Sequence, residues 1–144
     1  MQNEVSSLVF LQYLSTVFDN IEDAIILINV EPDQKYRLMM ANKSFFKNTG
    51  YKHSVVGSFL NDFISKESYK DLNGKYQTVI ETRQPVTFTT PYSVPLGRVT
   101  YRIKVIPILN SVGVVIQLAG IIQDVTELEL LRKQIKELAG ANAA

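Results

Sequence analysis

The side chains of this chain that could do chemistry are concentrated near its C-terminal end, where an apolar run of residues ends and a charged run begins. Asp124 and Thr126 follow the apolar run, and Glu129 comes three residues after the threonine. This spacing is that of a capping box, in which the threonine hydroxyl accepts the N–H of the glutamate and the glutamate carboxylate reaches back to the threonine N–H. The pattern therefore predicts that a helix begins at Thr126, with a cap worth about 1 kcal/mol.

Other reactive side chains are scarce. The chain contains no cysteine, which excludes disulfides, thiol chemistry and cysteine-ligated zinc. Its single histidine, His53, lies in a polar stretch, and one histidine among scattered carboxylates does not have the ligand spacing of a metal site. We interpret His53 as a solvated loop residue and expect no metal.

Composition bounds the class of protein. A chain of 144 residues with 46% hydrophobic residues is expected to form one globular domain with a real core. The 15 basic and 14 acidic residues are interspersed, which argues against a nucleic-acid surface. The sequence shows neither a signal peptide nor an apolar run of the roughly 18 residues that a membrane span needs. We expect a cytoplasmic protein without membrane insertion.

The hydropathy pattern places strands at both ends of the domain and helices between them. Strands are predicted at 24–30 and 36–41, helices or helical turns at 42–50, 55–64 and 66–83, and strands at 86–94, 98–109 and 114–125. Asn42 is the expected N-cap of the first of these helices, and Gly50 its C-terminal glycine. This order predicts an α+β domain with a single antiparallel five-stranded sheet and helices between strands two and three.

An apolar interior is expected between the sheet and the middle helices. The ligand-pocket candidates, which share an inward-facing position in the predicted elements, are Phe46, Tyr51, Phe63, Tyr76, Phe88, Tyr101, Ile103, Ile116, Leu118 and Ile122. Ligand pockets are mostly apolar with a few placed polar groups, and ordinary cores have the same composition. Both interpretations of this interior, a packed core and a pocket for a small organic ligand, stay open.

The N-terminal segment, residues 1–19, is predicted to be a helix that is apolar on most sides. Such a helix must be buried on more than one side. It is also the one spare apolar element that could cover Ile25, Leu27 and Ile121 on the outer face of the sheet. It either docks on its own domain alone or docks there and also makes a dimer contact.

The C-terminal segment, residues 126–144, has an apolar seam. Leu128, Leu131, Ile135 and Leu138 are spaced by three, four and three residues, which is the spacing of a heptad seam. This helix either lies on its own domain or begins a parallel dimeric linker. The second interpretation makes the chain a homodimer and a fragment of a longer protein in which an output domain follows.

Residues 15–130 resemble a PAS domain. The resemblance rests on Ala41–Tyr51, Val56–Gly57 and Asp124–Thr126, in this order. It implies a non-catalytic sensory and dimerisation module with a core at 20–125, which signals through its last helix to a histidine kinase or diguanylate cyclase in the same polypeptide. The expected relay residues are Asp124, Thr126 and Glu129. Asp124 is either the family's pairing residue at the strand end or an acid favoured by the helix dipole.

The resemblance also bears on cofactors. Flavin-binding light sensors of this family use a reactive cysteine, and a glutamine two positions before the final aspartate, where this chain has Ile122. Gln123 is adjacent but points to the opposite face of the strand. Haem-binding members usually supply a histidine from the long helix, and 66–83 contains none. Flavin and haem are therefore not expected, and the ligand is unknown.

The alternative function is a small α+β enzyme of cone-like or hot-dog-like shape that acts on an apolar substrate. Such an enzyme needs an acid or base inside its cavity. The apolar faces of the predicted strands carry no Asp, Glu or His, and Tyr76 and Tyr101 are poor bases near neutral pH because tyrosine has a pKa of about 10. The non-catalytic function is favoured.

Overall fold

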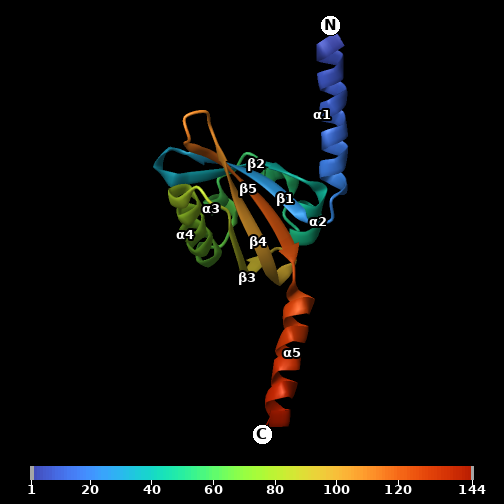
Figure 1. Cartoon of the computed structure of the whole chain (residues 1–144), viewed down its shortest axis with the longest axis vertical. Helices are drawn as coiled ribbons and strands as arrows, with labels where there is room; N and C mark the ends of the chain where they lie inside the picture. The colour runs from blue at the N-terminus through green and yellow to red at the C-terminus, as the bar shows by residue number, and fades with distance from the viewer. Residues whose placement is uncertain (1, 144) are drawn as a thin grey trace.

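The computed structural model describes the backbone of residues 2–143 and the side chains of residues 7–141. It confirms an α+β domain with one five-stranded antiparallel sheet (Figure 1). The elements are α1 (Gln2–Asn20), β1 (Ala24–Glu31), η1 (Pro32–Gln34), β2 (Lys35–Ala41), α2 (Lys43–Thr49), η2 (His53–Val55), α3 (Leu60–Phe63), α4 (Lys66–Thr82), β3 (Val86–Val94), β4 (Gly97–Leu109), β5 (Val115–Asp124) and α5 (Thr126–Ala143).

The sheet has the strand order β2-β1-β5-β4-β3. The first and last strands of the domain are therefore neighbours, with Ile28 opposite Leu118. At the other side of β5, Asp124 lies opposite Tyr101 of β4. Because β5 lies in the middle of the sheet and leads directly into α5, the last helix starts from the centre of the domain and not from its edge.

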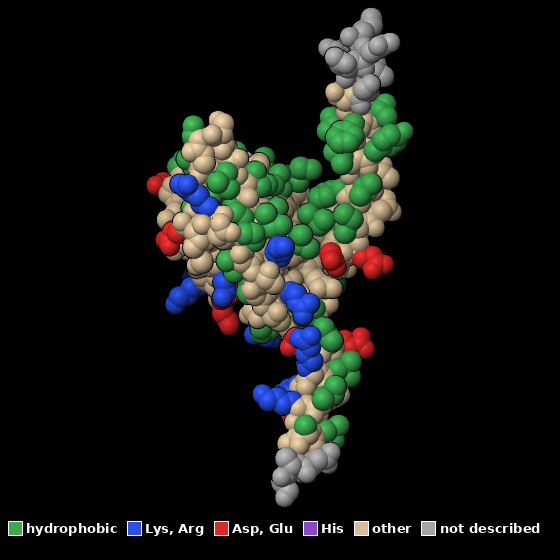
Figure 2. Space-filling model, viewed as in Figure 1, with side chains coloured by type: hydrophobic (Ala, Val, Ile, Leu, Met, Phe, Trp, Pro, Cys, Tyr) green, Lys and Arg blue, Asp and Glu red, His purple; other side chains and the backbone are tan. Residues whose placement is uncertain are grey.

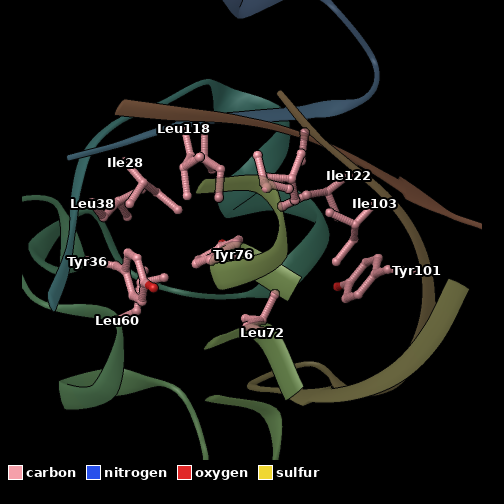
Figure 3. Close-up of a cluster of buried hydrophobic side chains, with 14 of the residues drawn as sticks. Ile28, Tyr36, Leu38, Leu60, Leu72, Tyr76, Tyr101, Ile103, Leu118 and Ile122 are labelled. Atoms are coloured by element: carbon pink, nitrogen blue, oxygen red, sulfur yellow. The ribbon is translucent and has the colours of Figure 1, made fainter. Parts of the chain in front are cut away.

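One face of the sheet forms the core together with α2, α3 and α4. The alternation predicted for β4 is confirmed, because Tyr101, Ile103 and Val105 are all buried. Figure 3 shows Tyr101 and Ile103 on the same side of the sheet as Leu72 and Tyr76 of α4. Burial of this apolar surface provides the main driving force for the α+β arrangement.

Ile116 is a correction to the predicted core. The pairing of β4 with β5 shifts register between Ile108, which lies opposite Gln117, and Leu109, which lies opposite Val115. The extra residue in β5 is a bulge, and it reverses the alternation at that point. Val115 is consequently buried, whereas Ile116 is 42% exposed and does not face the interior.

The structure confirms Asn42 as the N-cap of α2, and the same side chain makes further hydrogen bonds to neighbouring segments. Its fully buried side chain accepts hydrogen bonds from the N–H groups of Phe45 and Ile25, at 3.2 and 2.9 Å. Its amide nitrogen donates to the carbonyl oxygens of Phe18 and Asp23, at 3.0 and 2.9 Å. One side chain thus joins the end of α1, the start of β1 and the start of α2.

Helix α1 does not dock on its own sheet, and the prediction that it covers the outer face is wrong. Figure 1 shows α1 and α5 leaving the domain in opposite directions. The C-terminal end of α1 is held by α2, where Lys43 N–H donates to the Asp19 carboxylate and the Ser44 hydroxyl donates to Ile21 O. These bonds aim the helix away from the sheet. Helix α5 likewise extends from the domain, which excludes the alternative that it lies on its own core.

The outer face of the sheet and α1 both present apolar side chains. In one row across the sheet, Met40 lies opposite Leu27, Leu27 lies opposite Ala119, and Ala119 lies opposite Ile106. Figure 2 shows hydrophobic side chains over the domain and along α1.

Within the described part of the chain, no helix combines the length and apolar character needed to cross a bilayer.

Candidate functional site

An internal cavity of about 60 Å³ lies between the inner face of the sheet and helices α2, α3 and α4. Its lining is mainly aliphatic and aromatic. The lining residues are Ile26, Leu38, Phe45, Thr49, Tyr51, Leu60, Phe63, Ile64, Ser68, Leu72, Tyr76, Tyr92, Ser93, Val94, Tyr101, Ile103, Gly120 and Ile122. None of them carries a charged side chain at neutral pH.

The structure brings together six of the ten predicted pocket residues. Tyr51, Phe63, Tyr76, Tyr101, Ile103 and Ile122 line the cavity. Leu118 is fully buried in the surrounding core but is not part of the lining. Their role in binding a ligand stays a prediction.

The other three predicted residues lie elsewhere. Ile116 is displaced by the bulge described above. Phe46 stacks on the imidazole of His53 with 3.9 Å between the ring centroids. Phe88 lies under the ammonium group of Lys75, which is 5.2 Å from its ring centroid. Both aromatic rings pack against the core but do not line the cavity, so their expected contact with the cavity is wrong.

Tyr92 is the most informative lining residue that sequence reasoning missed. It shares the inward face of β3 with Phe88 and Val94, so alternation from Phe88 would have found it. Its side chain is 7% exposed, and its hydroxyl donates to the Asp71 carboxylate of α4 at 2.5 Å. Burial and this bond raise the pKa of Tyr92.

The tyrosines of the cavity are uncharged groups at neutral pH. Burial, followed by the negative charge of Asp124 and the neighbouring Tyr51, raises the pKa of Tyr101 to about 12. Burial likewise raises the pKa of Tyr76. The Tyr101 hydroxyl is a buried atom with no hydrogen-bond partner among the described residues. It is therefore a neutral donor that is free to bond to something inside the cavity.

The join between β5 and α5 departs from the predicted capping box. The helix begins at Thr126 as expected, but its hydroxyl accepts the backbone N–H of Thr100 at 2.9 Å and donates to the Asp124 carboxylate at 2.7 Å. Asp124 also accepts the N–H of Thr126, at 3.0 Å. Glu129 donates its N–H to Val125 O, and its carboxylate pairs with a residue of the next turn. The box fails because strand β4 offers Thr126 a nearer partner.

Thr100 connects this join to the cavity. Its N–H is bonded to Thr126, and its carbonyl oxygen accepts the N–H of Val125 at 2.9 Å. The next residue along β4 is Tyr101, whose side chain lines the cavity. Adjacent residues of one strand thus contact the interior and hold the start of α5.

The predicted seam of α5 is exposed along its length. Leu128, Leu131, Ile135 and Leu138 are between 41% and 65% exposed in the single chain. No cluster of three or more His, Cys, Asp or Glu side chains that could hold a metal ion occurs among the residues described. The candidate site therefore consists of the apolar cavity, the hydrogen-bonded join between β5 and α5, and the exposed apolar seam of α5.

The domain therefore combines one antiparallel sheet, an apolar cavity beneath it and a helix that leaves directly from the last strand. The PAS fold family model matches residues 18–130, and the chain belongs to this family. PAS domains are generally non-catalytic sensory modules. The assignment confirms the resemblance drawn from the sequence motifs.

Solved structures show the same fold. An RNA-binding Light-Oxygen-Voltage receptor shares 24% identity with a TM-score of 0.75, over 90% of this chain and 37% of that one. A PAS domain from Colwellia psychrerythraea shares 18% identity with a TM-score of 0.68, over 82% of this chain and 98% of that one. A PAS domain from a two-component sensor histidine kinase shares 12% identity with a TM-score of 0.62, over 82% and 98%.

This chain therefore spans little more than a third of the light-oxygen-voltage receptor to which it is similar. Comparison with curated protein sequences found no match. At these identities the structural likeness defines the fold and leaves the function to the residues of this chain.

Proposed function

We propose that this chain is a dimeric sensory PAS module that relays a change in its core, through α5, to an output domain in the same polypeptide. A histidine kinase or a diguanylate cyclase is the output that this architecture suits. The observation that carries the proposal is the adjacency of Thr100 and Tyr101. The backbone N–H and carbonyl oxygen of Thr100 hold the base of α5 through bonds to the Thr126 hydroxyl and the Val125 N–H, and Tyr101 lines the cavity.

The relay follows from this geometry. Asp124 and Thr126 bond each other and attach the helix to β4, so α5 cannot tilt without breaking these bonds or moving the strand. A ligand or rearrangement that displaces Tyr101 acts on the same strand one residue away. Glu129, the third relay candidate, makes its side-chain contact within α5, so its contribution would be to stiffen the first turn.

The surfaces left uncovered support a second copy of this chain as the partner. Six large side chains of α1 are 49–67% exposed, and they are Leu8, Phe10, Leu11, Tyr13, Leu14 and Val17. A groove of about 420 Å³ runs between α1 and Met40 at the edge of the sheet. A two-fold dimer uses the same patch on both copies, and an apolar helix beside an apolar sheet face is self-complementary in this sense. The α5 seam would extend that interface.

Sedimentation equilibrium of the chain tests the dimer. We expect a reversible dimer that is weakened by Leu14→Glu in α1 and by Ile135→Glu in the seam, because each change places a charge in an apolar interface. Lys133→Glu is the matched control, because its position lies opposite the seam on the same helix. A wild-type chain that stays monomeric at high concentration would contradict the dimer.

The relay is tested by joining the end of α5, in heptad register, to the dimeric catalytic region of a histidine kinase. We expect Thr126→Val to change autophosphorylation while the chimaera remains dimeric, because valine has no hydroxyl to accept the N–H of Thr100 or to donate to Asp124. Thr126→Ser keeps the hydroxyl and should behave as the wild type. Equal activity of all three proteins would count against a relay through this join.

A further inference from the structure

Tyr92 lies between the internal cavity and a second hollow at the surface. The second hollow is a polar groove of about 140 Å³ between α4 and β3, and it is lined by Glu67, Ser68, Asp71, Thr90, Pro91, Tyr92 and Arg98. Tyr92 and Ser68 line both spaces. The buried ring of Tyr92 and its bond to Asp71 therefore form the partition between the cavity and the groove.

The bond across this partition joins two elements. Tyr92 belongs to β3, an edge strand of the sheet, and Asp71 belongs to α4. Ser68 is engaged separately, because its hydroxyl accepts a hydrogen bond at 3.0 Å from the hydroxyl of Ser65, the N-cap of α4. Rotation of the Tyr92 ring, after its hydroxyl leaves Asp71, would open the cavity to the polar groove without unfolding either element.

The chemistry of the lining restricts what the cavity can hold. A charged molecule would lose its hydration there without meeting a counter-charge, which is strongly unfavourable. The Thr49 hydroxyl is already donated to Phe45 O, and the Tyr92 hydroxyl to Asp71. The Tyr101 hydroxyl has no partner among the described residues, and Figure 3 shows it turned toward the interior of the cluster.

We propose that the cavity binds a small uncharged molecule with one hydrogen-bond acceptor, such as a short ketone, aldehyde or ester, and that Tyr92 with Asp71 is its gate. Tyr101 donates to the acceptor, and the aliphatic lining covers the rest. A cavity of about 60 Å³ has room for a molecule of several non-hydrogen atoms, because about 10–15 Å³ is already enough to hold one water. The signalling role of this ligand site rests on the sensory function proposed above.

Titration of the chain with butanone, followed by amide NMR, tests the site. We expect saturable shifts at cavity residues, and none with propionate, which has as many non-hydrogen atoms but carries a charge. Tyr101→Phe should weaken butanone binding about fivefold, as expected for the loss of one neutral hydrogen bond. It should leave the binding of xenon, which accepts no hydrogen bond, unchanged.

The gate is tested by the exchange rate of bound butanone in the same spectra. Tyr92→Phe keeps the ring and removes the bond to Asp71, so association and dissociation should both accelerate while the dissociation constant changes little. Thr89→Val is the control, because it removes an exposed hydroxyl from the same strand without touching the cavity or the Asp71 bond. Unchanged exchange in Tyr92→Phe would overturn the gate.

Any one of three results would contradict the proposed binding site. They are the absence of saturable butanone shifts, equal binding of butanone by Tyr101→Phe, and binding of propionate as tight as that of butanone. Each leaves the dimer and the relay untouched, because those are measured by sedimentation and by autophosphorylation. Failure of the relay with intact butanone binding would instead contradict the proposed function alone.

Discussion

The hydroxyl of Thr126 accepts the backbone N–H of Thr100 at 2.9 Å, which ties the first residue of α5 to a strand 26 positions earlier in the chain. We expect Thr126→Val to lower the free energy of unfolding by about 1 kcal/mol, the net value of a typical hydrogen bond. Thr126→Ser should keep most of the stability. Urea denaturation of both variants checks this, and equal loss in the two would show that the hydroxyl is not what matters.

Gly120 lies against Ile26 on the inner face of the sheet. A Cβ at Gly120 would be 2.9 Å from Cγ1 of Ile26, so we expect Gly120→Ala to destabilise the domain by about 1–3 kcal/mol through overpacking. Gly74 in α4 has open space around it, and Gly74→Ala should instead stabilise by about 1 kcal/mol. Thermal unfolding distinguishes the two glycines.

The Gly120 prediction has an internal check. Ile26→Ala alone should cost about 2–5 kcal/mol as a core truncation. In the double variant the removed isoleucine atoms leave room for the new methyl group, so the combined loss should be smaller than the sum of the single losses. Strict additivity would mean that the strain of Gly120→Ala arises elsewhere.

Asn42 holds three segments together with four side-chain hydrogen bonds. Asn42→Ala should cost about 3 kcal/mol or more, because buried backbone groups left without partners cost about 1–3 kcal/mol each. Asn42→Asp keeps the acceptors but turns a carboxylate toward the carbonyl oxygens of Phe18 and Asp23. Denaturant midpoints at neutral pH should fall in both variants.

The pH dependence of Asn42→Asp separates loss of donors from burial of charge. The introduced carboxyl is desolvated and faces carbonyl oxygens, so its pKa in the folded state should be raised. Stability is then fully present at acidic pH and is lost as the pH rises through the folded pKa. A variant whose stability shows the same pH profile as the wild type would contradict this account.

Tyr36 and Tyr92 are buried tyrosines with opposite hydrogen-bond status. The Tyr36 hydroxyl has no partner among the described residues, whereas that of Tyr92 donates to Asp71. Tyr36→Phe should therefore leave stability unchanged or raise it by about 1 kcal/mol, and Tyr92→Phe should lower it by about 1.5–3 kcal/mol. Chemical denaturation measures the difference, and the opposite ranking would refute it.

Alkaline pH should destabilise the domain through its buried tyrosines. Burial raises the pKa of Tyr36 to about 12, as it does for Tyr101, whereas the ordinary pKa of tyrosine is about 10. The unfolded chain therefore loses protons at lower pH than the folded one, so stability is complete below about pH 10 and falls as the pH approaches about 12. Tyr36→Phe should reduce the slope, which denaturation in this pH range would show.

Short-range patterns in the sequence predicted the elements well. The alternation of β4, the Asn42 cap of α2 and the start of α5 at Thr126 all depend on residues a few positions apart, and all are confirmed. The six correctly placed cavity residues follow from the same alternation and helix periodicity. Local backbone geometry fixes which way these side chains point, so the sequence is sufficient for them.

Tertiary structure decided what depends on distant partners. The pairing of β1 with β5 and the bulge at Ile116 arise from contacts between segments far apart in the chain. The outward direction of α1 is set by hydrogen bonds from α2, and the cap at Thr126 by Thr100. The sequence by itself determined the elements and much of the cavity. Only the folded chain decided where its helices leave the domain and that Tyr92 lies between the cavity and the polar groove, because those outcomes depend on which long-range partner lies nearest.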